Sequence, residues 1–260
     1  MNERRCALDM VSTVTHLTIS LVGIAAFLHP FWSAGQHDAQ RPDAPIMAAG
    51  LITLSLVAML LDAQRASLGV KQIALLGILS AMNAALRFAE TALPGPGGFT
   101  PLFLLIICGG YAYGPRFGFL LGSLSLLASA IVTAGIGPWL PFQMYTAGWM
   151  GLSAGWLAMI LRDKFDRREH IVITAFGFAW GFGYGAIMNL WSWPYTLDPA
   201  ALGSPAAVLQ RYAAYYAATS AVWDLFGAFG NAVLIALFAP AAVRALQRFR
   251  SRLTFRIAVP

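Results

Sequence analysis

The chain has 260 residues, of which 58% are hydrophobic and 11% are charged, with a formal net charge of +6. Long apolar runs occupy most of it, and this pattern places the protein in a lipid bilayer. The positive charge is mainly a signal of membrane topology and is poor support for a nucleic-acid partner. The two cysteines, Cys6 and Cys108, are not placed for a disulfide to each other and give no metal-site spacing.

The apolar runs predict an all-α membrane protein with eight transmembrane helices. A helix needs about 20 residues to cross a hydrocarbon core of roughly 30 Å. The expected spans are 10–29, 46–62, 72–89, 101–113, 117–134, 142–161, 171–192 and 213–238. The run at 101–113 is the weakest of these, and it crosses only with flanking residues or local thinning of the bilayer.

Basic residues concentrate in every second connecting segment. With the N-terminus inside, the inner segments hold 14 of the 17 Lys and Arg residues, Arg41 and Arg211 lie in outer loops, and Arg87 lies within a span. The positive-inside rule therefore predicts a multi-pass membrane protein with both termini in the cytoplasm.

A change in composition near residue 66 divides the chain into two predicted parts. Residues 1–66 are expected to form an accessory two-helix membrane hairpin, and residues 67–260 a six-helix membrane domain that is the candidate for binding a small molecule. The outer loops of the second part, at 90–101, 135–141 and 191–211, are rich in Gly, Pro and Trp. They share one side of the membrane, so they can converge on an outward-facing pocket, although such residues also simply end helices.

Polar residues inside the spans are the first candidates for a binding site, because charged groups in a membrane normally face a cavity or a partner. Asn83, Arg87 and Glu90 share one face of their span. Asp224 and Asn231 share a face of the last span. An ion pair between Arg87 and Asp224 is one hypothesis; the alternative is a local pair between Arg87 and Glu90 at the interface.

Aromatic and amide side chains near the outer surface are the second set of candidates. An interfacial aromatic belt would explain the aromatic residues, but the inner surface lacks a comparable cluster. The asymmetry favours a site that stacks a flat organic ligand and hydrogen-bonds its edges. The residues assigned to it are Trp139, Phe142, Gln143, Asn189, Trp191, Trp193 and Trp223.

Small residues recur at four-residue spacing in three spans, which lets helix backbones approach closely in lipid. The three stripes are Gly77, Ala81 and Ala85; Gly114, Gly118 and Gly122; and Gly177, Gly181 and Gly185. Most such stripes only pack a fold, but one of these three is a candidate for docking another membrane subunit.

Signals for catalysis are weak. The segment 151–155 fits G-x-S-x-G around Ser153, but it lies in an apolar helix and no histidine is evidently available as its base. The chain has no G-x-x-x-x-G-K-[ST] loop, so ATP hydrolysis by that route is excluded. We therefore expect no catalytic residue, no metal and no cofactor.

Residues from about 70 to 250 resemble the substrate-binding S-component of an energy-coupling factor (ECF) vitamin transporter. The resemblance rests on the six-span layout and on five segments, of which GPWLPFQM is the most specific. The segments are ALRFAE at 85–90, GGFTPLFLLIICGGYAYGPRFGFLLG at 97–122, GPWLPFQMYTAGWMGLSAG at 137–155, NLWSWP at 189–194 and WDLFGAFGNAV at 223–233. The preceding hairpin resembles an extension found in some bacterial members.

The resemblance implies capture of a vitamin or related micronutrient, followed by association with a transmembrane coupling subunit and two ATPases. It also implies that Gly77, Ala81 and Ala85 form a docking stripe, since Ala81 and Ala85 match the family's Ala-xxx-Ala motif. GPWLPFQM resembles S-components linked to cobalamin or its precursors; riboflavin, queuosine precursors and thiazole or pyrimidine precursors are the alternatives. An intramembrane enzyme and a structural membrane partner are the competing functions.

Overall fold

The computed structural model describes residues 69–92, 99–137, 139–161, 165–193 and 204–253. It also describes a few positions between 14 and 54. Its regular structure in these ranges is helical throughout. The helices are α3 (Val70–Ala92), α4 (Leu102–Tyr113), α5 (Pro115–Val132), α6 (Leu140–Leu161), α7 (Arg167–Ser192), α8 (Pro205–Thr219) and α9 (Ala221–Leu253).

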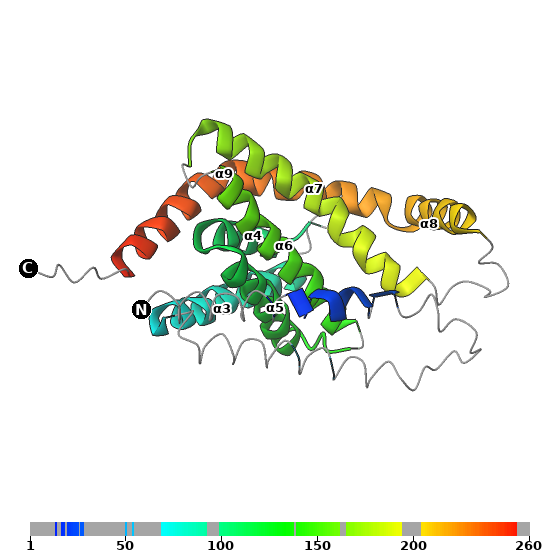
Figure 1. The fold of residues 1–260 in the computed structure, drawn as a ribbon, viewed down its shortest axis with the longest axis horizontal. Helices are drawn as coiled ribbons and strands as arrows, with labels where there is room; N and C mark the ends of the chain where they lie inside the picture. The colour runs from blue at the N-terminus through cyan, green and yellow to red at the C-terminus, as the bar shows by residue number, and fades with distance from the viewer. Residues whose placement is uncertain are drawn as a thin grey trace, which may run out of the picture.

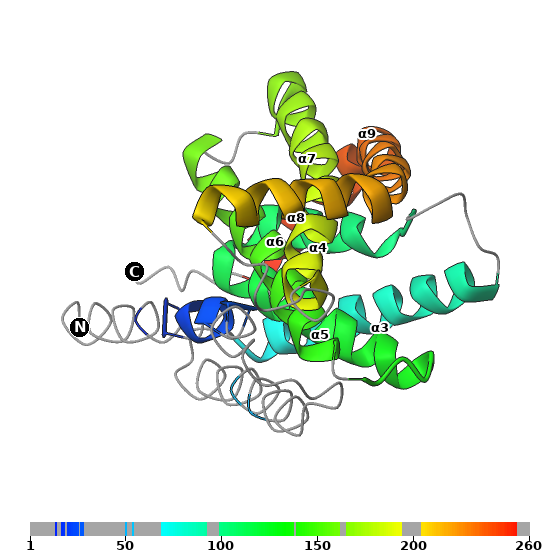
Figure 2. The ribbon, with the colours of Figure 1, turned by 90° about the vertical axis from the view of Figure 1, so that its right-hand side faces the viewer.

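The helices form two packed groups that meet through α4 and α6. Helices α3 and α5 pack together on one side, α7 and α9 pack together on the other, and α4 and α6 lie between them (Figures 1 and 2). Helix α4 contacts α5, α6 and α9, so it joins the groups. Its side chains are correspondingly almost all buried, including Ile106, Ile107 and Tyr111.

The predicted core spans from 72–89 to 171–192 correspond in order to α3 through α7, with shifted boundaries. The prediction of one continuous span at 213–238 is wrong, because the helix is interrupted at Ser220, between α8 and α9. Helix α8 has its own start, where Ser204 accepts a hydrogen bond from the Ala207 backbone at 3.3 Å and Pro205 occupies the first turn. A one-residue break between two apolar helices leaves the hydrophobic pattern almost unchanged.

Within the described ranges, four helices are long and apolar enough to cross a membrane: α3, α5, α7 and α9. Helix α4 has 12 residues and is a shorter apolar helix. The all-helical membrane class is therefore supported, whereas the count of eight spans is not confirmed. The two N-terminal spans lie largely outside the described residues. In the part of the first that is described, Phe27 packs edge-on against Phe142 of α6, with ring centroids 5.0 Å apart.

Two of the three small-residue stripes pack helix against helix. A Cβ added to Gly118 of α5 would collide with the backbone of Gly151 on α6, and one added to Gly122 would collide with the backbone of Ala147. On α7, a Cβ at Gly181 would collide with Ala228 of α9. These glycines allow backbones to meet where any side chain would hold them apart.

The end of the bundle that is predicted to face the cytoplasm is tied together by polar contacts. Arg250 of α9 donates to the carbonyl of Ala112 at the end of α4 at 2.9 Å. The Tyr111 hydroxyl donates to the buried carboxylate of Glu169 near the start of α7. Three helices are thereby linked at the basic end of the molecule.

Helix α9 contains Pro240, and a histidine on α7 compensates for the hydrogen bond that this proline removes. Proline has no N–H, so the carbonyl of Ala236, four residues earlier, has no helical donor. The ring Nε2 of His170 lies 3.0 Å from that carbonyl oxygen. His170 therefore satisfies the carbonyl that Pro240 leaves without a donor, which requires a proton on Nε2.

Replacing His170 with alanine should destabilise the fold by about 0.5–1.5 kcal/mol, because it removes the hydrogen bond that the exposed carbonyl of Ala236 accepts. In a Pro240→Ala background the same replacement should cost much less, since the new backbone N–H can bond to Ala236. Thermal unfolding of the wild type, both single variants and the double variant in detergent measures this coupling. Equal losses from His170→Ala in the two backgrounds would show that the ring does not compensate for the proline.

Candidate functional site

A cavity of about 290 Å³ lies at the end of the bundle that the charge pattern assigns to the outside. Each of α3, α4, α5, α6, α7 and α9 contributes to its wall. Its lining residues are Arg87, Thr100, Leu102, Phe103, Leu126, Gln143, Gly181, Tyr184, Gly185, Met188, Asn189, Ser220, Asp224 and Gly227. The cavity therefore sits where all six core helices converge.

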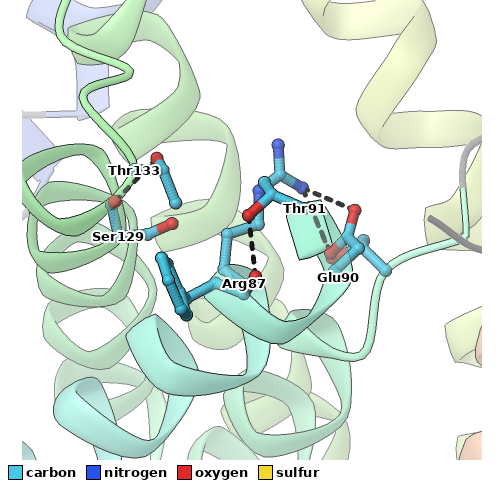
Figure 3. A network of polar contacts seen from close by, with 7 residues as sticks. Arg87, Glu90, Thr91, Ser129 and Thr133 are labelled. Carbon is cyan, nitrogen blue, oxygen red and sulfur yellow. Dashed lines mark hydrogen bonds and ion pairs between the residues drawn. The ribbon is translucent and has the colours of Figure 1, made fainter. Parts of the chain in front are cut away.

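Arg87 occupies one wall and is held by a local polar network. Its Nη1 atom lies 3.2 Å from Oε1 of Glu90, one turn along α3, and Figure 3 shows the guanidinium turned toward that carboxylate. Thr100 donates to Oε2 of Glu90 at 2.7 Å and lies 3.5 Å from Arg87. The structure thus pairs Arg87 with Glu90 and not with Asp224, because the i,i+3 spacing brings the two charges together within one helix.

Asp224, in the first turn of α9, occupies the wall formed with α7. Its carboxylate packs directly on Gly185, where a Cβ would collide with both carboxylate oxygens. The Oδ2 atom is buried and has no hydrogen-bond partner. The absence of a side chain at Gly185 is therefore what allows Asp224 to occupy this position.

Amide, hydroxyl and aromatic groups complete the cavity. Asn189 near the end of α7 donates to the Ser220 hydroxyl at 2.7 Å, which fixes the turn before α9. The side-chain amide of Gln143 on α6 makes no hydrogen bond among the described residues, so it is free to meet a ligand. Phe103 and Tyr184, with ring centroids 4.8 Å apart, supply an apolar surface.

Four residues assigned to the site from sequence line this cavity: Arg87, Gln143, Asn189 and Asp224. Glu90 lies behind Arg87 as its partner. Asn83 is fully buried between α3 and α5, where it donates to Ser125 at 2.8 Å. Asn231 is buried further along α9, and both polar atoms of its side chain lack partners. These two asparagines are not among the lining residues.

The aromatic candidates with described side chains are not among the residues that line the cavity. Trp139 is 42% exposed and its Nε1 donates to the Gly135 carbonyl at 3.3 Å, while Trp223 is 60% exposed. Phe142 is buried, and Trp193 packs edge-on against Tyr212. The side chain of Trp191 lies outside the described residues.

Several lining residues carried no signal of a binding role in the sequence. Gly185 was assigned only to a packing stripe, and Thr100 and Ser220 lie just outside the helices. Tyr184 and Met188 are ordinary members of an apolar helix. The helix break before α9 is the one feature that points to Ser220, and a one-residue break does not change the hydrophobic periodicity of the sequence.

Other possible sites lack the features of an active centre. Ser153 donates within its own helix, to the carbonyl of Trp149 at 2.7 Å, as a packing serine does. A hollow of about 520 Å³ lies at the start of α7, but one short stretch of α7 lines it on a single side. Among the described residues there is no group of three or more His, Cys, Asp or Glu residues that could hold a metal ion.

An all-helical membrane bundle with a polar cavity at one end is suited to binding a small molecule. A family model for the ECF transporter, substrate-specific component, matches residues 71–239, which is 169 of the 260 residues. The chain therefore belongs to the family of ECF transporter substrate-specific components, the S-components. Comparisons with curated proteins and with solved structures gave no significant match.

Proposed function

We propose that this protein is the substrate-capture subunit of an ECF-type ABC importer for a vitamin or related micronutrient. The observation that carries the proposal is the cavity at the predicted outer end, to which all six core helices contribute. Its combination of an apolar aromatic surface with a few polar groups is typical of a small-molecule site. Membership of the S-component family supports the same function.

The family also supports a membrane coupling subunit and ATPases as the kind of partner. We propose that the coupling subunit docks on α3 through Gly77, Ala81 and Ala85. All three residues are exposed, and no atom lies within 4 Å of a Cβ built on Gly77. Ile78 and Met82 on this helix are 59% and 49% exposed, so an apolar membrane surface is available there. Small residues in such a surface suit close helix contact.

We propose that the ligand is a vitamin or a vitamin precursor. The GPWLPFQM segment favours a corrinoid, whereas a cavity of about 290 Å³ is near the small end of the range for ligand pockets. A corrinoid would need further enclosure by the outer segments at 93–98 and 194–203, which lie outside the described residues. Riboflavin and thiazole or pyrimidine precursors are smaller alternatives.

The first test is to purify the full chain in detergent and identify any co-purifying small molecule by mass spectrometry. A stoichiometric vitamin or precursor would establish capture and name the substrate. An intramembrane enzyme would instead lose turnover, but not binding, on replacement of Ser153 or Asp224. A structural partner would show no saturable binding across a vitamin panel, and this result would overturn the proposed function.

Gln143→Ala should weaken binding of the identified ligand roughly 3- to 10-fold, because it removes a free amide from the cavity wall. Trp139→Ala is the matched control, since Trp139 precedes the same helix but does not line the cavity. Isothermal titration calorimetry of both variants measures the difference. If Trp139→Ala weakens binding and Gln143→Ala does not, the ligand lies outside this cavity.

A further inference from the structure

We propose that the cavity recognises a small substrate through a positively charged nitrogen that pairs with the carboxylate of Asp224. This inference rests on the proposed capture function and specifies the chemistry of the ligand. The ligand class is a compact amine or protonated nitrogen heterocycle.

The first step is that Asp224 has no basic partner among the residues that the structure describes. Its Oδ2 atom is buried without a hydrogen bond, although the residue lines the cavity. Among the described residues, no Arg, Lys or His side chain forms an ion pair with it. The neutral hydroxyl of Tyr216 interacts with this carboxylate, but neither the hydroxyl nor Oδ2 makes a hydrogen bond of normal geometry. Asp224 is partly buried, and a carboxylate with a buried oxygen and no cationic partner is costly, so a cation supplied from outside the protein would stabilise it.

The second step is the charge balance of the cavity. Among the residues that the structure describes, the charged ones that line the cavity are Arg87 and Asp224. Arg87 is already matched by Glu90 at 3.2 Å, with Thr100 joining the two. The pair contributes no net charge, which leaves Asp224 as the uncompensated charge. A cationic ligand would neutralise the site, whereas an anionic ligand would be repelled by the carboxylate.

The third step concerns the protonation state of Asp224. A neutral aspartic acid that only donates a hydrogen bond is the competing explanation for a buried carboxyl group. Asp224 lies in the first turn of α9, where the helix dipole favours a negative charge. Burial of Oδ2 opposes this charge in the empty cavity, and a cationic ligand would restore it. The isosteric amide distinguishes the two states by experiment.

The fourth step is the size and shape of the cavity. About 290 Å³ suits a ligand of one or two rings. Phe103 and Tyr184 offer aromatic surface for a ring or a cation, and Gln143 offers an amide for its polar edge. Pyrimidine or thiazole compounds that bear a basic nitrogen satisfy these conditions together.

The test uses the purified full chain and Asp224→Asn, which keeps the shape of the side chain and removes its charge. The probes are thiamine, 4-amino-5-aminomethyl-2-methylpyrimidine, its neutral 5-hydroxymethyl counterpart, riboflavin and cobinamide, titrated by calorimetry at pH 7. We expect a cationic amine or heterocycle to bind most tightly and Asp224→Asn to weaken it at least roughly tenfold. An unchanged elution profile and melting temperature would show that the variant remains folded.

The inference is overturned if the tightest probe is riboflavin or cobinamide, or if Asp224→Asn binds the tightest probe as well as the wild type does. Either result leaves the capture function standing. Absence of saturable binding to every probe, together with no co-purified ligand, would overturn the capture function and this inference with it. If Asp224→Asn does not fold, the wild-type ranking of the aminomethyl compound against its hydroxymethyl counterpart decides the question, and equal or reversed affinities would count against a cation site.

Discussion

Gly118→Ala should be among the most destabilising single-methyl changes in this protein. The added Cβ would collide with the carbonyl group of Gly151 on α6 and with the backbone of Gly110 on α4. Backbone atoms cannot rotate away as a side chain can, so α5 must move from both neighbours. We expect a loss of about 3 kcal/mol, at the upper end for overpacking, with a fall of roughly 5–10 °C in melting temperature.

Gly77→Ala is the matched control for that change. It replaces the same residue type in another membrane helix, but its Cβ would meet no atom within 4 Å. Alanine favours helix over glycine by up to about 1 kcal/mol, so this variant should be as stable as the wild type or more so. Thermal unfolding in detergent measures both variants. Similar melting temperatures for the two would mean that α5 and α6 are not in backbone contact.

Gly185→Ala should abolish or greatly weaken ligand binding. The new Cβ would occupy the position of the Asp224 carboxylate, so that carboxylate must move and the cavity wall between α7 and α9 must change. We expect affinity to fall by more than about tenfold, because a displaced charged group no longer meets the ligand. Calorimetry with the identified ligand measures the loss.

Gly183→Ala provides the control on the same helix. Its Cβ would lie 3.6 Å from the nearest atom, on Trp180, which is an ordinary contact. Gly183 does not line the cavity, and binding should be unchanged. Loss of binding in both variants would point to a general effect on α7 and not to the contact between Gly185 and Asp224.

The sequence predicted the helical class and most core helices because each depends on local hydrophobicity over many residues. The bounds 142–161 and 171–192 lie close to those of α6 and α7. The end of α8 was missed because Ser220 interrupts an apolar stretch for one residue. The sequence also predicted Arg87, Gln143 and Asn189 near the outer surface and Asp224 deeper in its span, and the structure brings all four around one cavity.

The details of the cavity were less accessible because they depend on contacts between distant segments. Arg87 can reach several partners by sequence, and only tertiary placement shows which is near; the structure selects Glu90. Tryptophan is as typical of a membrane interface as of a binding site, and Trp139 and Trp223 are exposed. Gly185 acquires its importance from Asp224, 39 positions away in the chain.

Helix α3 carries two different surfaces on opposite sides of its own cylinder. Arg87 faces the cavity, while Ala81 and Ala85 are exposed on the outside within two turns of it. A helix is about 10 Å across, so the cavity and the proposed docking stripe are separated by the thickness of one helix. Any shift of α3 on ligand entry displaces both surfaces together, and a coupling subunit in contact with this stripe would sense occupancy without a relay of intervening residues.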